Sequence, residues 1–376
     1  MTSTTAPVTP TGVEWTASGP RPVADLDAAF THGTTEGIVE VRYDYRAELL
    51  DFGAGSAESA TGLWRYAGLL PPFPGPVTYP LRVGGTALLR PAALARRIGL
   101  PNLLVKDETQ GPSLSNKDRS TALVVEYARQ TGAAAVAAAS TGNVAASLAV
   151  GAAAVGIPAV IFVPSDVDPG KLMASATTGA TIVLVEQGYQ AAFALSRQMA
   201  RRFGWLDRNT GVNPLTIEGK KTVAFEIWEQ NGRRFPDTVV APIGDGVTLY
   251  ALAKGFAELA ACGAPGRQPR IVGVQSSGCA PVASAWRDGG RIEPVQPDTV
   301  ATGSPSELRC AGRSCSTRSG GPRARSSRST TPRSSTPCTS WAAPGCSPSR
   351  PVPAPTQVCA LRSTPASSGA TSRWWS

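Results

Sequence analysis

The fold is decided by the stretch Ser113-Leu-Ser-Asn-Lys-Asp-Arg119, which places one lysine between a hydroxyl-rich turn and an apolar helix. We expect Ser115 to N-cap this helix, which ends before Gly132, so that Lys117 falls in its first turn. The helix dipole there disfavours the ammonium form, and Arg119 adds positive charge nearby. A lysine that forms a Schiff base needs such surroundings, because its amine must be neutral at working pH. The alternative is a solvated charge cluster that opens a surface helix.

Two glycine-containing turns follow, each between a predicted strand and a predicted helix. The first, Ser140-Thr-Gly-Asn143, offers backbone amides at a helix N-terminus, where an anion such as a substrate carboxylate is favoured. The second, Gly244-Asp-Gly-Val-Thr248, has glycines that allow the backbone to approach a phosphate closely. Either turn alone is weak evidence, and the first is typical of an ordinary N-cap. Taken with Lys117, they predict a site for a covalently held phosphate cofactor.

Short apolar strands alternate with helical stretches between residues 100 and 274. This alternation predicts an α/β fold with parallel sheets covered by helices. In such sheets the ligand lies at the carboxyl ends of the strands, where Asn143 and Gly244 both fall. The predicted strands cover residues 134–139, 159–163, 181–185, 238–243 and 271–274.

The composition is that of a globular protein with room for two covered cores, since the chain has 376 residues and is 42% hydrophobic. No apolar run reaches membrane-spanning length. Residues 1–22 are rich in Thr, Pro and Ala and lack the regions of a signal peptide, so we expect a flexible leader. These features predict a cytoplasmic protein with no membrane partner.

Together and in this order, the three motifs resemble those of fold-type II pyridoxal phosphate (PLP) enzymes, the tryptophan synthase beta superfamily, and most closely the threonine synthases. The resemblance covers roughly residues 60 to 304 and includes further landmarks: Gly84-Gly-Thr-Ala-Leu-Leu89, Val105-Lys-Asp-Glu108 and Glu218-Gly-Lys-Lys-Thr222. It implies a two-domain fold with PLP in the interdomain cleft. Residues 23–116 plus 204–308 would form the larger, PLP-binding domain, and residues 117–203 a smaller inserted domain.

The resemblance also implies a role for each motif residue. Lys117 would hold the cofactor as a Schiff base and carry protons during turnover, and Asn143 would face the phenolic oxygen of the cofactor. The substrate carboxylate would bind to Ser140, Thr141 and Gly142. The cofactor phosphate would bind to Gly244, Asp245, Gly246, Val247 and Thr248.

Three positions depart from the family's pattern. Asn116 stands where an aromatic residue is common, Asp245-Gly-Val247 replaces the usual paired glycines, and Lys220 stands where glutamine is frequent. These departures put the identity of the substrate in more doubt than that of the cofactor. Lys220 and Lys221 are candidates for extra anion recognition, with a solvated helix face as the alternative.

The activity that the resemblance implies is that of a lyase converting O-phosphohomoserine, or a related activated amino acid, to threonine and phosphate. Within the same fold, the alternatives are a cysteate synthase-like enzyme, or a dehydratase or ammonia-lyase acting on serine, threonine or diaminopropionate. The partner would be a small amino-acid substrate, and the family suggests a homodimer. An alternative of another class is an inactive, degenerate PLP fold whose basic tail binds nucleic acid nonspecifically.

The character of the chain changes after about Leu308. Ten of the 36 basic residues, all arginines, follow with no acidic residue, and the remaining 26 balance the 27 acidic ones. The net charge of +9 therefore comes from this tail, and nucleic acid is an unlikely partner of the protein as a whole. Residues 309–376 are either a basic, Ser/Pro-rich disordered tail that binds RNA or acidic surfaces, or the product of a reading-frame shift in a GC-rich gene.

We favour the frameshift. Residues 327–355, back-translated with GC-rich codons and read two nucleotides later, give a helical pattern that ends in Glu-Pro-Ala-Gly-Ala, a landmark of the resembled family. The tail as written lacks the hydroxyl residue that meets the pyridine nitrogen in that family, so we expect a poorly stable or weakly active protein. An intact reading frame in resequenced DNA would contradict this interpretation.

The cysteines and the sole histidine predict no metal site. No cysteine pair has zinc-finger spacing with matching histidines, and we expect His32 at the surface. Five of the seven cysteines lie in the tail. The other two, Cys262 and Cys279, are expected to be small core or near-surface residues in a reducing compartment.

Overall fold

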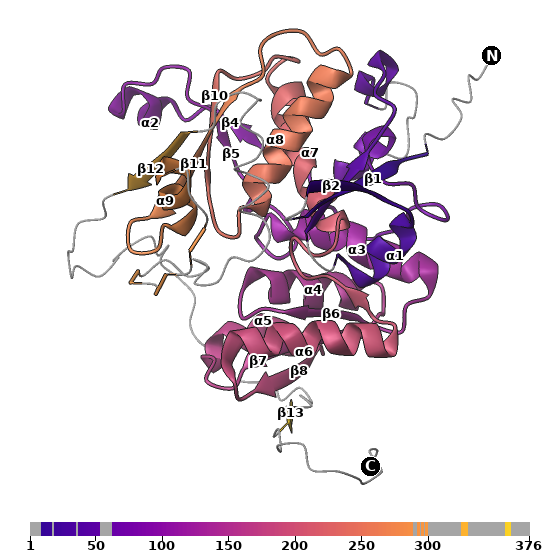
Figure 1. Cartoon of the computed structure of the whole chain (residues 1–376). Helices are drawn as coiled ribbons and strands as arrows, with labels where there is room; N and C mark the ends of the chain where they lie inside the picture. Colours follow the sequence, from indigo (N-terminus) through magenta and orange to yellow (C-terminus); the bar gives the residue numbers. More distant parts are fainter. Residues whose placement is uncertain are drawn as a thin grey trace, which may run out of the picture.

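The computed structural model of the chain is shown in Figure 1. It describes residues 9–16, 19–34, 37–52, 62–288, 292–293, 295–296 and 298–299, together with the backbone of strands at 325–329 and 358–361. The predicted frameshift concerns residues that, apart from those two strands, lie outside this description. None of the helices within the described ranges is both long and apolar enough to span a bilayer.

A five-stranded parallel sheet forms the layer at the bottom of Figure 1. Its strand order is β13 (Val358–Leu361), β8 (Thr181–Val185), β7 (Ala159–Pro164), β6 (Val136–Ala139) and β9 (Leu206–Asp207). All four neighbouring pairs are parallel, as the alternation of strands and helices predicted. The bounds of β8 agree with the prediction, and the other predicted strands shift by one or two residues.

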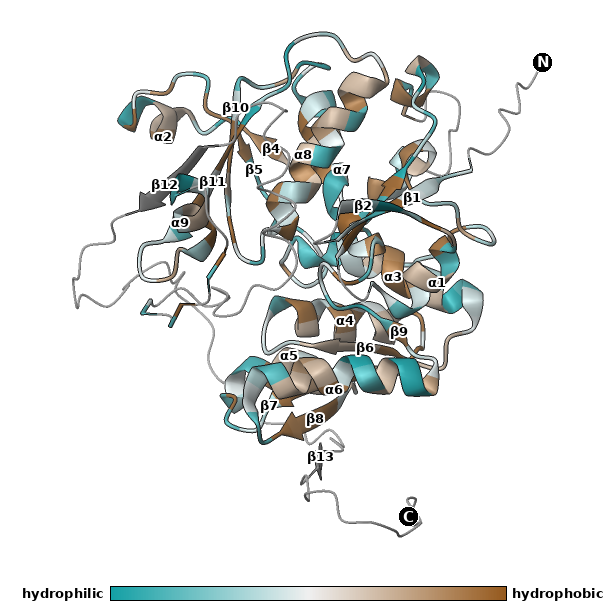
Figure 2. Ribbon diagram, in the orientation of Figure 1, coloured by the Kyte–Doolittle hydropathy of each residue, from teal (hydrophilic) through white to brown (hydrophobic). Residues whose placement is uncertain are grey.

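Both faces of this sheet are buried, which explains why its strands are apolar without alternation. Alternate residues such as Ala138 and Ile161 pack in one core with α3 (Lys117–Thr131) and α4 (Asn143–Ala154). Their neighbours, such as Phe162, pack in a second core against α6 (Gly188–Phe203). Figure 2 shows the hydrophobic residues along β8 and the mixed polarity of α6, as expected for a helix with one face in water.

A second parallel sheet has the order β10 (Thr238–Pro242), β11 (Arg270–Ser276) and β12 (Arg325–Ser329). Its core joins residues of α7 (Leu215–Gln230) and α8 (Val247–Ala261), including Trp228 and Phe256, with Ile243 and Ile271. Helix α9 (Pro281–Asp288) follows β11 and packs against it.

Helices α3, α7 and α8 pack side by side between the two sheets (Figure 1). Helix α7 is buried on every side from Leu215 to Trp228. Its close contact with α3 depends on Gly219, where an added Cβ would lie 2.2 Å from the carbonyl oxygen of Arg119. Charged residues on a helix buried in this way must find partners, and their pairing determines much of the site described below.

A third, antiparallel sheet has the order β2 (Gly19–Val23), β1 (Thr11–Thr16) and β3 (Ile38–Arg42). This differs from the expected flexible leader over residues 1–22. Glu14 is buried on β1, and Trp15 Nε1 donates a hydrogen bond of 3.0 Å to Glu40 Oε2 on β3. Cross-strand contacts of this kind stabilise a segment that its composition alone describes as disordered.

The remaining elements are short. They are α1 (Leu26–His32), η1 (Ala47–Leu50), η2 (Gly62–Leu69), β4 (Leu88–Leu89), α2 (Ala92–Arg97), β5 (Val105–Lys106), η3 (Pro169–Leu172) and α5 (Met173–Ala176). Strands β4 and β5 pair with each other in antiparallel orientation. Strand β9 lies beyond Phe203, so the sheet of β6 to β8 continues past the predicted end of the smaller domain, and the division into two domains stays a prediction.

Candidate active site

Lys117 lies in the first turn of α3, as predicted, but it is the first residue of the helix, and the cap residue is Asn116 rather than Ser115. Asn116 has helical backbone angles, with φ −60° and ψ −8°, and its side chain makes no capping hydrogen bond. Ser115 still contributes, because its hydroxyl oxygen accepts a hydrogen bond of 3.3 Å from the Lys117 amide. The Lys117 Nζ donates to Asn116 Oδ1 at 2.7 Å. The turn before the helix therefore holds both the backbone and the amine of Lys117.

The surroundings of Lys117 lower the pKa of its amine. Burial lowers the pKa of Lys117, the carboxylate of Asp245 opposes this, and the guanidinium of Arg208 lowers the pKa further. A lowered pKa is what a nucleophilic lysine needs. The sequence indicated this property of Lys117, but it did not indicate Arg208, which is 91 residues away along the chain.

Arg119 has a different role from the one expected. Its guanidinium is buried and pairs with Glu108 and Glu226, in each case at 2.7 Å. Glu226 also pairs with Lys106 at 2.6 Å. A buried guanidinium needs such carboxylates to offset the loss of its hydration. Arg119 therefore ties α3 to α7 and to the segment at residues 105–108, and it is not a free charge beside Lys117.

Arg208 follows β9 and is fully buried. Its Nη2 donates to the carbonyl oxygen of Lys117 at 3.2 Å, its Nε to Thr121 Oγ1 at 3.2 Å, and its Nη1 to Thr210 Oγ1 at 2.8 Å. These acceptors are uncharged, and burial lowers the pKa of Arg208 to about 10. Arg208 thus brings a buried positive charge to the N-terminal end of α3.

The turn formed by Ser140, Thr141, Gly142 and Asn143 connects β6 to α4, as predicted. Gly142 is the cap residue of α4, and its amide donates to Ser140 Oγ at 3.2 Å. Gly142 and Asn143 are exposed, while Ser140 and Thr141 are partly buried. The exposed helix start leaves room for an anion at the backbone amides.

Helix α4 is linked to α3 one turn beyond the start of each helix. Ser147 Oγ donates to Thr121 Oγ1 at 2.7 Å, and both residues are buried. Ser147 lies four residues after Asn143, and Thr121 lies four residues after Lys117. This contact fixes α4 against the helix that carries the lysine.

The segment from Gly244 to Thr248 connects β10 to α8, as predicted. Gly246 is the cap residue of α8 and has φ +83°, a left-handed conformation that favours glycine. Asp245 Oδ1 accepts a hydrogen bond of 3.0 Å from the Val247 amide, so the aspartate caps the helix start. The carboxylate of Asp245 raises the pKa of Lys117, so this loop and the lysine interact electrostatically.

Lys220 on α7 belongs to the same cluster. It is 1% exposed, and its Nζ has no hydrogen-bond partner among the described residues. Burial lowers the pKa of Lys220 to about 7, Asp245 raises it, and Lys117 and Arg208 lower it. The alternative of a solvated helix face is therefore wrong for Lys220, because α7 is buried between α3 and α8.

The same correction applies to Lys221, which is fully buried. Its Nζ pairs with Glu218 at 2.5 Å and Glu258 at 2.8 Å and lies 4.2 Å from the centre of the Tyr43 ring. Lys254 joins this group through Glu218 at 3.1 Å and through Glu258. Lys221 is thus matched by carboxylates, whereas Lys220 is not.

The cluster around Lys117 fits an anionic ligand. Lys117, Arg208 and Lys220 are three basic groups, and Asp245 is the carboxylate that acts most strongly on both lysines. A buried cation without a partner is costly unless an anion offsets its charge. A phosphate group would supply that anion, and the Gly244–Thr248 loop would supply backbone amides.

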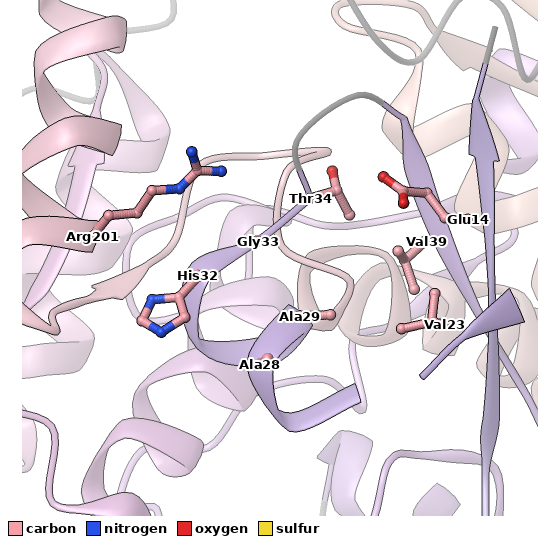
Figure 3. A pocket seen from close by; sticks show the side chains of 9 residues that line it. All are labelled: Glu14, Val23, Ala28, Ala29, His32, Gly33, Thr34, Val39 and Arg201. Carbon is pink, nitrogen blue, oxygen red and sulfur yellow. The ribbon is translucent and has the colours of Figure 1, made fainter. Parts of the chain in front are cut away.

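Two cavities are not part of this cluster. The larger one, about 400 Å3, lies between α1 and the N-terminal sheet (Figure 3). Figure 3 shows His32 and Arg201 on one side of the opening and Glu14 on the other. A smaller cavity of about 250 Å3 is lined by Lys254 and Glu258 among others. No residue of the predicted site lines either cavity, so His32 stays outside the site.

In the ranges that the structure describes, no group of three or more His, Cys, Asp or Glu side chains could hold a metal ion. Cys262 and Cys279 are both buried, as expected for small core residues. Burial raises the pKa of Cys262 to about 11, which makes it a poor nucleophile near neutral pH. Four of the five tail cysteines lie outside the described residues, and only the backbone of the fifth, Cys359 on β13, is described.

A family model described as pyridoxal-phosphate dependent enzyme matches residues 79–313, more than half of the chain. The chain belongs to the pyridoxal-phosphate dependent enzymes. The cofactor of this enzyme is therefore pyridoxal phosphate, as predicted. The matched region includes Lys117, the Ser140–Asn143 turn and the Gly244–Thr248 loop.

Curated relatives narrow the class of enzyme. The threonine synthase of Methanosarcina acetivorans is 35% identical over 279 residues, which cover 73% of this chain and 68% of the relative. That of Methanocaldococcus jannaschii is 34% identical over 74% of this chain and 69% of the relative. That of Mycobacterium tuberculosis is 36% identical over 63% of this chain and 64% of the relative. The enzyme is a threonine synthase-like, PLP-dependent lyase, as predicted.

Solved structures agree with the predicted fold. The processed threonine deaminase isoform 2 of Solanum lycopersicum has a TM-score of 0.53 and 23% identity, with 61% of this chain and 66% of that chain covered. Maize serine racemase has a TM-score of 0.52 and 21% identity, with 65% and 71% covered. At such identities the likeness concerns the fold alone, which is the α/β fold of fold-type II PLP enzymes.

Proposed function

We propose that this enzyme converts O-phosphohomoserine and water to threonine and phosphate. The likeness to threonine synthases supports the reaction. The structural observation that supports the same reaction for this enzyme is the cluster of Lys117, Arg208 and Lys220, in which a nucleophilic lysine lies among buried positive charges. Such a cluster suits chemistry in which both cofactor and substrate carry phosphate.

Lys117 is the group that binds the cofactor and moves protons in this proposal. When bound, PLP supplies an electron sink that stabilises negative charge on the substrate. Burial and Arg208 hold the pKa of Lys117 below its usual value, so a neutral amine is available to accept a proton at the α carbon and return one during the later steps. Over the whole reaction, phosphate leaves the γ carbon and water adds its hydroxyl group at the β carbon.

The other residues bind and orient in this proposal. Ser140, Thr141 and Gly142 receive the substrate carboxylate at the start of α4, where the dipole and free amides favour an anion. Asn143 would face the phenolic oxygen of the cofactor. The loop of Gly244, Asp245, Gly246, Val247 and Thr248 would hold its phosphate at the start of α8.

We further propose a cytoplasmic location, a homodimeric assembly, and the division into a larger domain and a smaller inserted one. The strong change in composition after Leu308 supports the proposal that residues 309–376 are read out of frame. A frame-restored chain would then be the better one for kinetic work.

The test of Lys117 is to add PLP to the purified protein and record visible absorbance, reduce with borohydride, and locate the modified lysine by peptide mass. We expect a visible band and a modified peptide containing Lys117, with both lost in Lys117→Ala. The exposed Lys171 provides the matched control, Lys171→Ala, which should behave as wild type. Modification of another lysine would overturn the role of Lys117.

The substrate is tested separately by measuring phosphate release and threonine formation from O-phosphohomoserine. Serine, threonine and diaminopropionate serve as alternative substrates in parallel. Turnover of one of these three, without turnover of O-phosphohomoserine, would refute the proposed reaction while leaving the cofactor site intact.

A further inference from the structure

Helix α7 carries five charged side chains, four of them on its buried length, and four of the five are paired with an opposite charge. Glu218 and Lys221 pair with each other and with residues of α8, Glu226 pairs with Arg119 and Lys106, and the less buried Glu229 pairs with Arg65. Lys220 is the exception, since its Nζ has neither a hydrogen-bond partner nor a paired carboxylate among the described residues, whereas Lys221 has two carboxylates. An amine buried to this degree implies a ligand that the protein itself does not provide.

Asp245 presents the opposite problem. It places a carboxylate in the loop that would receive a phosphate, where the like charge would repel the ligand. Its Oδ1 already accepts a hydrogen bond from the Val247 amide, so the aspartate is fixed at the start of α8. A phosphate can bind beside this carboxylate only if nearby cations offset the charge.

Lys220 and Asp245 act on each other although they are 25 positions apart in the sequence. Asp245 is the charged group with the largest effect on Lys220, and no hydrogen bond joins the two in the described part of the chain. The buried amine of Lys220 is therefore left for a ligand, while its positive charge offsets the carboxylate of Asp245.

We propose that Lys220 is an anion-binding residue that offsets Asp245 and so allows a phosphate monoester to bind at the Gly244–Thr248 loop. The inference rests on the proposed function, because the phosphate belongs to the cofactor or to the phosphorylated substrate. Lys117 apart, the formal charges of Arg208 and Asp245 cancel, and Lys220 provides the remaining positive charge. Removing the Lys220 amine leaves Arg208 and Asp245, whose charges sum to zero, beside the phosphate.

The protonation of Lys220 gives this proposal a pH dependence. Burial lowers its pKa to about 7, with Asp245 opposing and Lys117 and Arg208 adding to the effect. The ammonium form binds phosphate, so the contribution of Lys220 to the affinity is highest below this pKa and falls as the pH rises through it. Bound phosphate raises the pKa of Lys220, and binding above neutral pH should therefore take up a proton.

The test is a double-mutant cycle on the full chain, with Lys220→Gln, Asp245→Asn and the double variant. The affinity for PLP is measured by equilibrium dialysis at several pH values, beside that for pyridoxal, which lacks the phosphate. We expect Lys220→Gln to weaken PLP binding by roughly 10- to 100-fold, the range for a hydrogen bond to a charged group, with little effect on pyridoxal. The double variant should recover most of the loss. Lys171→Gln, an exposed lysine, is the control.

The KM for O-phosphohomoserine distinguishes the two sources of phosphate. A loss of PLP affinity assigns Lys220 to the cofactor phosphate. A raised KM with unchanged PLP affinity assigns it to the substrate phosphate. Either result supports the proposal, whereas wild-type values for both ligands, or a double variant no better than Lys220→Gln, would overturn it.

Folding of the variants is checked by thermal melting without ligand. Removing an unpaired buried charge should leave Tm unchanged or raise it. Lys220→Met keeps the apolar stem of the side chain and provides a second test of the loss of phosphate affinity. If the wild-type protein does not bind PLP, the proposed function fails. If it binds PLP and the cycle shows no coupling, only the role of Lys220 fails.

Discussion

Replacing Glu226 by glutamine should destabilise the enzyme strongly, because this carboxylate is buried between Arg119 and Lys106. Burial alone would raise the pKa of Glu226, but Arg119 and Lys106 hold it at about 2, compared with an ordinary value of 4.5. A tenfold change in an equilibrium is about 1.4 kcal/mol, so the ionised form is stabilised by about 3 kcal/mol. Breaking a buried pair typically costs about 3–5 kcal/mol, which agrees with this value.

Urea unfolding followed by tryptophan fluorescence measures the loss directly. We expect Glu226→Gln to lose about 3 kcal/mol near neutral pH, with a fall in Tm of roughly 6–12 °C. Glu229→Gln is the control, since the partly exposed Glu229 pairs with Arg65 and should cost about 1 kcal/mol or less.

The pH dependence separates this explanation from a general packing defect. The folded-state pKa of Glu226 is lowered, so its contribution is complete above the unfolded pKa of 4.5 and is lost as the pH falls towards 2. The gap between wild type and Glu226→Gln should therefore shrink by about 2 kcal/mol between neutral pH and about pH 3. A loss below about 1 kcal/mol near neutral pH, or a gap that does not change with pH, would refute the reasoning.

Two further substitutions test contacts around the lysine. Arg208→Gln removes the guanidinium that lowers the pKa of Lys117, so the pH midpoint for formation of the visible PLP band should move upward. The control Arg202→Gln, on the exposed end of α6, should leave this midpoint unchanged. An unmoved midpoint in Arg208→Gln would contradict the effect of Arg208 on the pKa of Lys117. Gly219→Ala places a Cβ 2.2 Å from the Arg119 carbonyl oxygen and should destabilise by about 1–3 kcal/mol, although alanine usually stabilises a helix. The control Gly75→Ala, where the nearest atom to the added Cβ is 3.6 Å away, should hardly change the free energy of unfolding measured with urea. A Gly219→Ala protein as stable as wild type would show that α3 and α7 can move apart without loss of stability.

The sequence predicted the elements that local signals define. The helix after Lys117 ends at Gly132, whose φ of +68° is the left-handed end that glycine favours. Strand β8 and the turns at 140–143 and 244–248 were found because apolar runs stop there at small or polar residues. These features depend on neighbours in the chain.

The features that were missed depend on tertiary packing. Lys220 and Lys221 lie in a segment that reads as a charged surface helix, and only its position between α3 and α8 buries them. Arg208 carries no local motif, and its role follows from the contact that it makes with the Lys117 carbonyl. The first strands of the chain were missed for the same reason, since pairing with β3 orders a Thr/Pro-rich segment that has no strong pattern of its own.

The complete burial of α7 has a consequence for the lifetime of the folded state. Its amides from Leu215 to Trp228 are enclosed by α3 on one side and α8 on another, so water reaches them only when these layers part. Hydrogen exchange at these positions would then proceed through opening of the whole fold rather than through local fraying. This one helix would report how often the entire molecule opens, while exchange at the ends of the shorter helices would report only local events.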